Sequence, residues 1–140
     1  MLNPAWLGYY WGPDDGVSDV FQEGIHLWMA DTNVAKFEYM FESRSNHGYT
    51  LAHEQGVVIS VTAGAIMIVL ESASSSAWED MFKEHHDQRD TTRQQRLIAI
   101  QRIEDGKPVL GYNGRVFMFA CSENSGTAEK YAALRKLLGG

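Results

Sequence analysis

The chain has little cysteine and none of the features of a secreted protein. Its 140 residues include a single cysteine, Cys121, so it cannot form an intramolecular disulfide. The first residues show no basic region followed by an apolar run, and the sequence holds no Asn-x-Ser/Thr glycosylation site. These absences favour a reducing compartment, and we expect a cytoplasmic protein.

Long hydrophobic runs and an excess of basic residues are also missing. The apolar stretch 57–70 is shorter than the roughly 20 residues that a membrane-spanning helix needs. The formal net charge is −6, which argues against general binding to nucleic acid or to an anionic membrane surface. An acidic chain of this kind is compatible with a basic protein partner.

Motifs that would identify an enzyme or a cofactor site are absent. The nucleophile elbow Gly-x-Ser-x-Gly, the phosphate loop Gly-x4-Gly-Lys-Ser/Thr and the dinucleotide motif Gly-x-Gly-x-x-Gly do not occur. His47, His53 and Glu54 are metal-ligand types, but an extended segment places the two histidines roughly 20 Å apart. We therefore expect no metal site and no cofactor, and we commit to no catalytic residue.

The stretch 57–70 is the feature around which we expect the chain to fold. It carries no charge and is rich in β-branched residues, which favour strands. Gly64 lies in its middle and indicates a turn between two strands, 57–62 and 65–71. The stretch predicts the centre of a sheet that is covered on both faces.

Residues 25–30 and 34–43 predict a hairpin around Thr32. The register that best separates apolar from polar side chains places Leu27 opposite Phe37 on a buried face. On the other face it places His26 opposite Glu38, with Trp28 and Lys36 beside them. A carboxylate next to an imidazole suits proton transfer, but such pairs also stabilise ordinary sheets.

Turn and capping motifs complete the predicted fold. Asp105-Gly106 and Asn113-Gly114 are hairpin turns, and they separate three strands at 97–103, 108–112 and 115–121. Ser76 and Glu79 match the capping box of a helix, and a second helix is expected at 127–138. The sequence thus predicts one α+β domain, 1–140, with a mainly antiparallel meander sheet of about eight strands and two main helices, one after the fifth strand and one C-terminal.

An aromatic-rich arm, residues 1–16, precedes this sheet and has two interpretations. The arm can lay its rings over the sheet, or it can form a binding surface, because tryptophan and tyrosine are frequent interface anchors. The candidate partner-binding residues are Trp6, Tyr9, Tyr10, Trp11, Asp14, Asp15 and Trp28.

Two functional hypotheses follow from these features. The first is a small acidic cytoplasmic binding protein without catalysis, such as an inhibitor, immunity-type protein, chaperone or adaptor, acting on a protein partner or as a homodimer. The second is a small-molecule-binding protein or small enzyme, with Trp28 and Tyr10 for stacking and His26 with Glu38 for proton transfer. A deep apolar pocket that includes His26 would favour the second hypothesis, and a flat aromatic patch the first.

Overall fold

The described chain is built almost entirely from β-strands. The computed structural model describes residues 2–13, 20–45, 48–79, 84–91 and 93–122. Its elements are a 3-10 helix, η1 (Pro4–Trp6), and the strands β1 (Gly8–Trp11), β2 (Val20–Asp31), β3 (Val34–Ser45), β4 (Gly48–Val61), β5 (Ala65–Glu79), β6 (Glu84–Asp90), β7 (Gln95–Glu104), β8 (Lys107–Tyr112) and β9 (Arg115–Cys121). Within these described residues η1 is the only helix, and no helix is long and apolar enough to cross a membrane.

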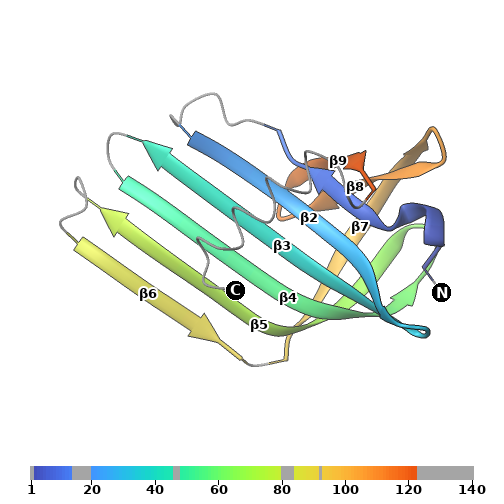
Figure 1. Cartoon of the computed structure of the whole chain (residues 1–140), viewed down its shortest axis with the longest axis horizontal. Helices are drawn as coiled ribbons and strands as arrows, with labels where there is room; N and C mark the ends of the chain where they lie inside the picture. The colour runs from blue at the N-terminus through green and yellow to red at the C-terminus, as the bar shows by residue number, and fades with distance from the viewer. Residues whose placement is uncertain (1, 14–19, 46–47, 80–83, 92, 123–140) are drawn as a thin grey trace.

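Eight of the strands form a closed antiparallel barrel (Figure 1). The order around the barrel is β1-β2-β3-β4-β5-β7-β8-β9, and β9 pairs with β1 to close it. β6 pairs with the second half of β5, outside this ring. Within the barrel, closure leaves the described strands without free edges, so that their backbone groups there are paired on both sides.

The long strands β2–β6 continue beyond one end of the barrel as an open sheet. β1 ends with Trp11 opposite Gly24, before it reaches the first residues of β2. β7 begins with Gln95 opposite Val69, so the second half of β5 pairs with β6 instead. We call this end of the barrel the barrel mouth. Beyond it, no described strand lies over the face of the sheet that lines the barrel interior.

The barrel interior below the mouth is filled with apolar side chains. Alternate residues of each strand point inward, as expected for a pleated strand. The largest fully buried side chains are Tyr10, Ile25, Leu27, Phe37, Met40, Ile66, Ile68, Leu70, Ile98, Leu110 and Phe117. All of them except Met40 belong to the main core cluster. Burying one large apolar side chain contributes about 1.5–3 kcal/mol, so this core is the main stabilising element of the barrel.

The two turns predicted from sequence are confirmed. Asp105 and Gly106 have φ angles of 52° and 76°, and Asn113 and Gly114 have 54° and 74°. Two consecutive positive φ angles define the type I′ turn, whose twist matches that of an antiparallel hairpin. These turns connect β7 to β8 and β8 to β9.

The predicted register of the first hairpin is also confirmed. Leu27 lies opposite Phe37 and His26 lies opposite Glu38. The turn at Gly64 lies between β4 and β5 as predicted, but the strand expected at 57–62 is the last part of a longer strand, β4. The expected cover on both faces is wrong in part, because Ile59 is 49% exposed.

The predicted α+β class is wrong, because the described residues form an all-β barrel. The expected first helix begins at Ser76, where β5 instead continues to Glu79. At Ala77, β5 pairs with β4 on one side and with β6 on the other. Pairing on both edges outweighs the local capping motif, since intrinsic helix propensity is a weak determinant. The expected helix at 127–138 lies outside the described residues.

Candidate functional site

The sequence-predicted site residues lie on opposite faces of the sheet. Tyr10 points into the barrel with 0% exposure, and its hydroxyl donates a hydrogen bond to the Trp6 carbonyl at 2.5 Å. Burial raises the pKa of Tyr10 well above its usual range. Trp28 alternates with the inward Leu27 and stacks on His26 outside the barrel. The site that the second hypothesis built from Tyr10 and Trp28 is therefore not formed.

On the outward face, His26 is held between two aromatic rings. The centroids of His26 and Tyr9 are 4.0 Å apart with an interplanar angle of 8°, and those of His26 and Trp28 are 4.6 Å apart at 19°. The Nδ1 atom of His26 lies 3.8 Å from Glu38 Oε1. His53 supplies a closer contact, with Nε2 2.6 Å from Glu38 Oε2.

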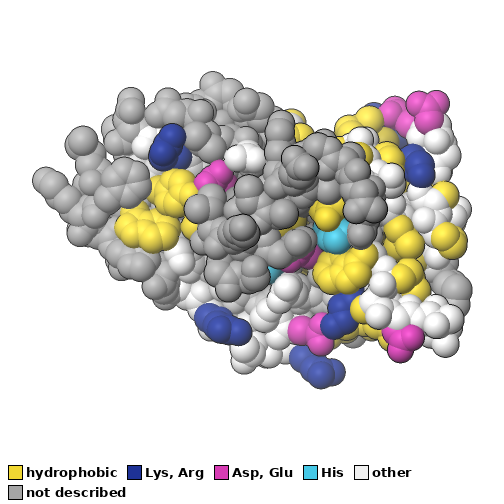
Figure 2. All heavy atoms as spheres, in the orientation of Figure 1, with side chains coloured by type: hydrophobic (Ala, Val, Ile, Leu, Met, Phe, Trp, Pro, Cys, Tyr) yellow, Lys and Arg dark blue, Asp and Glu magenta, His cyan; other side chains and the backbone are white. Residues whose placement is uncertain are grey.

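This His–Glu–His group is buried, whereas the sequence analysis expected an outward polar face. His26 is 6% exposed, Glu38 1% and His53 8%. Histidine and acidic side chains lie among hydrophobic ones near the middle of this face (Figure 2). A buried carboxylate needs hydrogen-bonding or charged partners, and His26 and His53 supply them. The buried Glu38 carboxylate thus has a hydrogen-bonding partner in His53 and a second imidazole, that of His26, at 3.8 Å.

The other aromatic residues of the predicted arm have structural contacts. The Trp6 indole Nε1 donates to the Gly106 carbonyl at 3.2 Å, which ties η1 to the β7–β8 turn. Trp11 is half-buried and packs with Tyr9 on the outward face. Asp14 and Asp15 lie outside the described residues. Residues 8–11 of the predicted arm form β1, a strand of the barrel itself, and do not lie over the sheet as a separate cover.

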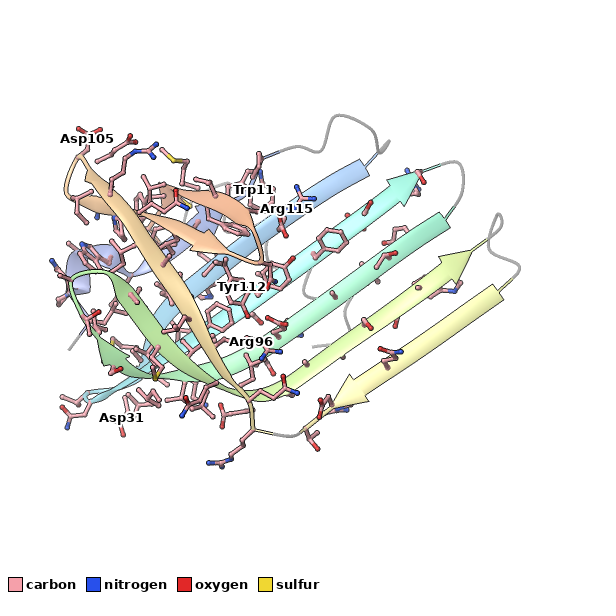
Figure 3. The ribbon with its side chains drawn as sticks, turned by 180° about the vertical axis from the view of Figure 1, so that it is seen from behind. Trp11, Asp31, Arg96, Asp105, Tyr112 and Arg115 are labelled. Carbon is pink, nitrogen blue, oxygen red and sulfur yellow. The ribbon has the colours of Figure 1, made fainter. Side chains whose placement is uncertain are left out.

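A second group, missed by the sequence analysis, gathers at the barrel mouth. Six polar side chains occupy inward-facing positions there, one from each of six strands. We call them the mouth ring: Glu23, Tyr39, Glu54, Arg96, Tyr112 and Arg115. Figure 3 shows Arg96, Tyr112 and Arg115 together at this end of the barrel. No sequence motif links them, because each comes from a different strand.

Each tyrosine of the mouth ring donates its hydroxyl to a carboxylate. Tyr39 donates to Glu23, and Tyr112 donates to Glu54 Oε1 at 2.5 Å. The two tyrosine rings meet edge to face, with centroids 5.5 Å apart. Burial, with the adjacent carboxylates, raises the pKa of Tyr39 and of Tyr112 well above the usual range. Both hydroxyls therefore stay protonated and act as hydrogen-bond donors.

Glu23 is the more deeply buried of the two acids in the mouth ring, Glu23 and Glu54. It is 2% exposed, and loss of solvation raises its pKa above the ordinary 4.5. The hydrogen bond from Tyr39 and the charge of Arg115 act in the opposite direction. The Arg115 Nε atom lies 3.4 Å from Glu23 Oε1.

Arg96 differs from Arg115 because it has no carboxylate partner in the described part of the chain. Its Nη2 donates to Gln94 Oε1 at 2.5 Å, and its Nη1 lies 3.4 Å from the Gln95 carbonyl. Gln94 in turn donates to Asp90 Oδ2 at 2.9 Å. The charge of Arg96 is therefore held in place by neutral acceptors and is available to an anion.

A trough of about 660 Å³ adjoins the mouth ring. Its lining residues are Ala52, Glu54, Ala73, Ser74, Ser75, Gln88, Arg89 and Asp90. Across β4, β5 and β6, Ala73 lies in register between Glu54 and Asp90. The small side chain of Ala73 therefore forms part of the floor of the trough, with a charged side chain on each side of it. In Figure 3 the long strands extend past the mouth with no other described strand in front of them. The volume is within the range of small-molecule sites.

A smaller cavity of about 300 Å³ lies at the other end of the barrel. Its lining is largely apolar and includes Leu2, Met29 and Val58, with no charged side chain. In the described residues, no cluster of three or more His, Cys, Asp or Glu side chains could hold a metal ion. Of these two cavities, the trough is the one with convergent charged and hydrogen-bonding groups.

Comparison of the chain with protein-family models, with curated proteins and with solved structures finds no match.

Proposed function

We propose that this protein is a binding protein that holds a small polar molecule in the trough beside the mouth ring. The observation that carries the proposal is the trough itself, about 660 Å³ in volume and bordered by Glu54 of the mouth ring. Concave sites of this size with a few fixed polar groups are typical of ligand-binding proteins. Ligand sites in β-barrel proteins are often found at the mouth of the barrel.

The chemistry of the site favours binding over catalysis. The tyrosines of the mouth ring are protonated donors, and Tyr112 is engaged with Glu54. The enzymatic alternative relied on His26 and Glu38, which point away from the barrel interior. We therefore favour the small-molecule-binding form of the second hypothesis, at a different site.

The remaining sequence-based expectations stay predictions. Binding to a basic protein partner, or to a second copy of the chain, was predicted partly from Tyr9 and Tyr10, which are 6% and 0% exposed. Side chains this buried offer little surface to a partner. We include a cytoplasmic location in the proposal because the chain has one cysteine, which fits a reducing compartment.

The proposal is tested by screening ligands against a variant with a blocked trough. Thermal-shift and calorimetric assays would use amino acids, sugars, nucleosides, amines and organic acids. Replacing Ala73 with tryptophan fills the floor of the trough, and Ala120→Trp on the exposed outside of β9 is the matched control. We expect at least one compound to bind the wild type and A120W but not A73W. Equal binding to A73W, or no binding by any compound class, would refute the proposal.

A further inference from the structure

Two opposite charges of the mouth ring face one hydroxyl group. The Tyr112 hydroxyl donates to Glu54 Oε1 at 2.5 Å. The Arg96 guanidinium is close enough to the same phenol to lower the pKa of Tyr112, against the larger effect of burial. Figure 3 shows Arg96 and Tyr112 beside each other at the mouth. Glu54 and Arg96 therefore both act on the Tyr112 hydroxyl. Glu54 lines the trough, and Arg96 lies next to it, linked through Gln94 to the lining residue Asp90.

These two charges are not paired with each other. Neither Arg96 nor Glu54 forms an ion pair with any residue in the described ranges, whereas Arg115 lies 3.4 Å from Glu23 on the other side of the mouth. The hydrogen bonds of Arg96 go to the Gln94 side chain and to a backbone carbonyl. A guanidinium has five N–H donors, so Arg96 keeps capacity for an oxyanion, and Glu54 keeps capacity for a donor.

The geometry points to a ligand with a zwitterionic head group, and we propose that the trough binds free α-amino acids or molecules with the same ammonium–carboxylate head. This inference rests on the proposed function, since it names the ligand class of the same site. In an α-amino acid one carbon separates the two charged groups, which lie roughly 3 Å apart. The carboxylate would meet Arg96 and the ammonium would meet Glu54, on either side of Tyr112.

The charge balance of the site disfavours the simpler ligand classes. A purely anionic molecule attracted to Arg96 would be repelled by Glu54, and a purely cationic molecule would face the reverse problem. A neutral sugar would leave both charges without a counter-ion. A zwitterion satisfies both, and charge-assisted hydrogen bonds are about twice as strong as neutral ones.

The trough leaves room for the rest of such a ligand. Its floor is formed by Ala52, Ala73 and Ser75, which are small enough to admit a side chain. Gln88 and Asp90 of β6 lie in register with Ser75 and Ala73, on the same face of the sheet, and can contact polar groups of a ligand. Amino acids with polar side chains are therefore the expected best binders within the class.

The test is a titration of the wild-type protein with free α-amino acids, their methyl esters and their N-acetyl derivatives. The ester removes the negative charge of the head group and the acetyl group removes the positive charge. We expect each modification to weaken binding roughly tenfold or more. The variants Glu54→Gln and Arg96→Gln should weaken binding of the free amino acid to a similar extent.

Two conservative variants outside the trough lining serve as controls. Arg102 and Glu104 form an exposed ion pair at 2.7 Å near the β7–β8 turn, and Arg102→Gln matches R96Q on the same strand. Glu71→Gln matches E54Q, since Glu71 pairs with Lys36 at the surface. Both controls should bind like the wild type. The esters and N-acetyl derivatives probe the wild-type chain, so the test does not depend on the folding of any variant.

The outcomes separate this inference from the proposed function. If a compound of another class binds and A73W abolishes its binding while amino acids do not bind, the trough is a ligand site but its ligand is not zwitterionic. If the esters or the N-acetyl derivatives bind as tightly as the free amino acids, the head-group assignment is wrong. If no compound binds in the trough, both the proposed function and this inference fail.

Discussion

At the scale of single residues, Glu23 shows how the barrel tolerates an acid among apolar side chains. It is 2% exposed, accepts the Tyr39 hydroxyl and lies 3.4 Å from the Arg115 guanidinium. These partners only partly offset the loss of water, so the pKa of Glu23 is raised by burial. The acid therefore destabilises the folded state most when it is ionised.

This shift predicts a pH-dependent stability that Glu23→Gln should remove. The folded protein binds the Glu23 proton more tightly than the unfolded chain, whose glutamate has the ordinary pKa of 4.5. The contribution to stability is therefore complete below that value and is lost as pH rises through the raised pKa. Urea unfolding measured at several pH values across this interval should show that the free energy of unfolding falls more steeply with pH for the wild type than for E23Q. The variant Glu104→Gln, at an exposed position, is the control for the titration of other groups. If the free energy of unfolding changes with pH in the same way for the wild type and E23Q, the raised pKa of Glu23 is contradicted.

Tyr10 provides a second prediction at this scale, because its ring and its hydroxyl can be removed separately. Tyr10→Ala deletes a fully buried ring and should reduce the free energy of unfolding by about 3–5 kcal/mol. Tyr10→Phe removes only the hydrogen bond to the Trp6 carbonyl and should cost about 0.5–1.5 kcal/mol. Chemical denaturation measures both. A near-neutral Y10A would mean that Tyr10 lies at the surface, as the binding-arm interpretation requires.

At the scale of elements, the pairing of β4 with β5 depends on a close approach at Gly56. A Cβ atom added there would lie 2.4 Å from the Val69 carbonyl oxygen and 3.1 Å from Leu70 Cα. Both contacts are with backbone, which cannot rotate away, so Gly56→Ala must disturb the register irregularity next to Gln55.

We expect Gly56→Ala to destabilise the protein by about 1–3 kcal/mol, the usual range for overpacking. Gly64 is the matched control, because a Cβ added there meets no atom within 4 Å. Thermal or urea unfolding of G56A and G64A should therefore give clearly different midpoints. Equal midpoints would contradict the strand pairing at this position.

Local and paired features of the elements could be predicted from sequence, and long-range ones could not. The I′ turns at 105–106 and 113–114 follow from short motifs, and the pairing of His26 with Glu38 follows from alternation within one hairpin. The strand character of Ser76–Glu79 depends on pairing with β4 and β6, which no local pattern encodes. The same limit applies to His53 beside Glu38, and to the mouth ring, whose six residues come from six strands.

At the scale of the whole molecule, closure of the barrel predicts a gradient of stability. β5 pairs on both sides along most of its length, whereas β6 pairs only with β5 among the described strands and is an edge strand of their sheet. The sequence of β6, Glu-His-His-Asp-Gln-Arg-Asp, is highly charged, as is common for strands that must not pair further. Amides of Ile66, Ile98 and Phe117, in the core, should exchange with solvent far more slowly than amides of β6. Hydrogen exchange followed by NMR measures this, and equal protection of β6 and the core would contradict the topology.

The whole account depends on the trough beside the mouth ring as the place where a ligand is held. Backbone amide shift mapping by NMR, during titration with a ligand from the screen, tests this most directly. We predict that the largest changes fall on Ala52, Ala73 and Ser75 of the trough floor. Changes centred instead on His26 and Trp28, on the outward face of β2, would contradict the account.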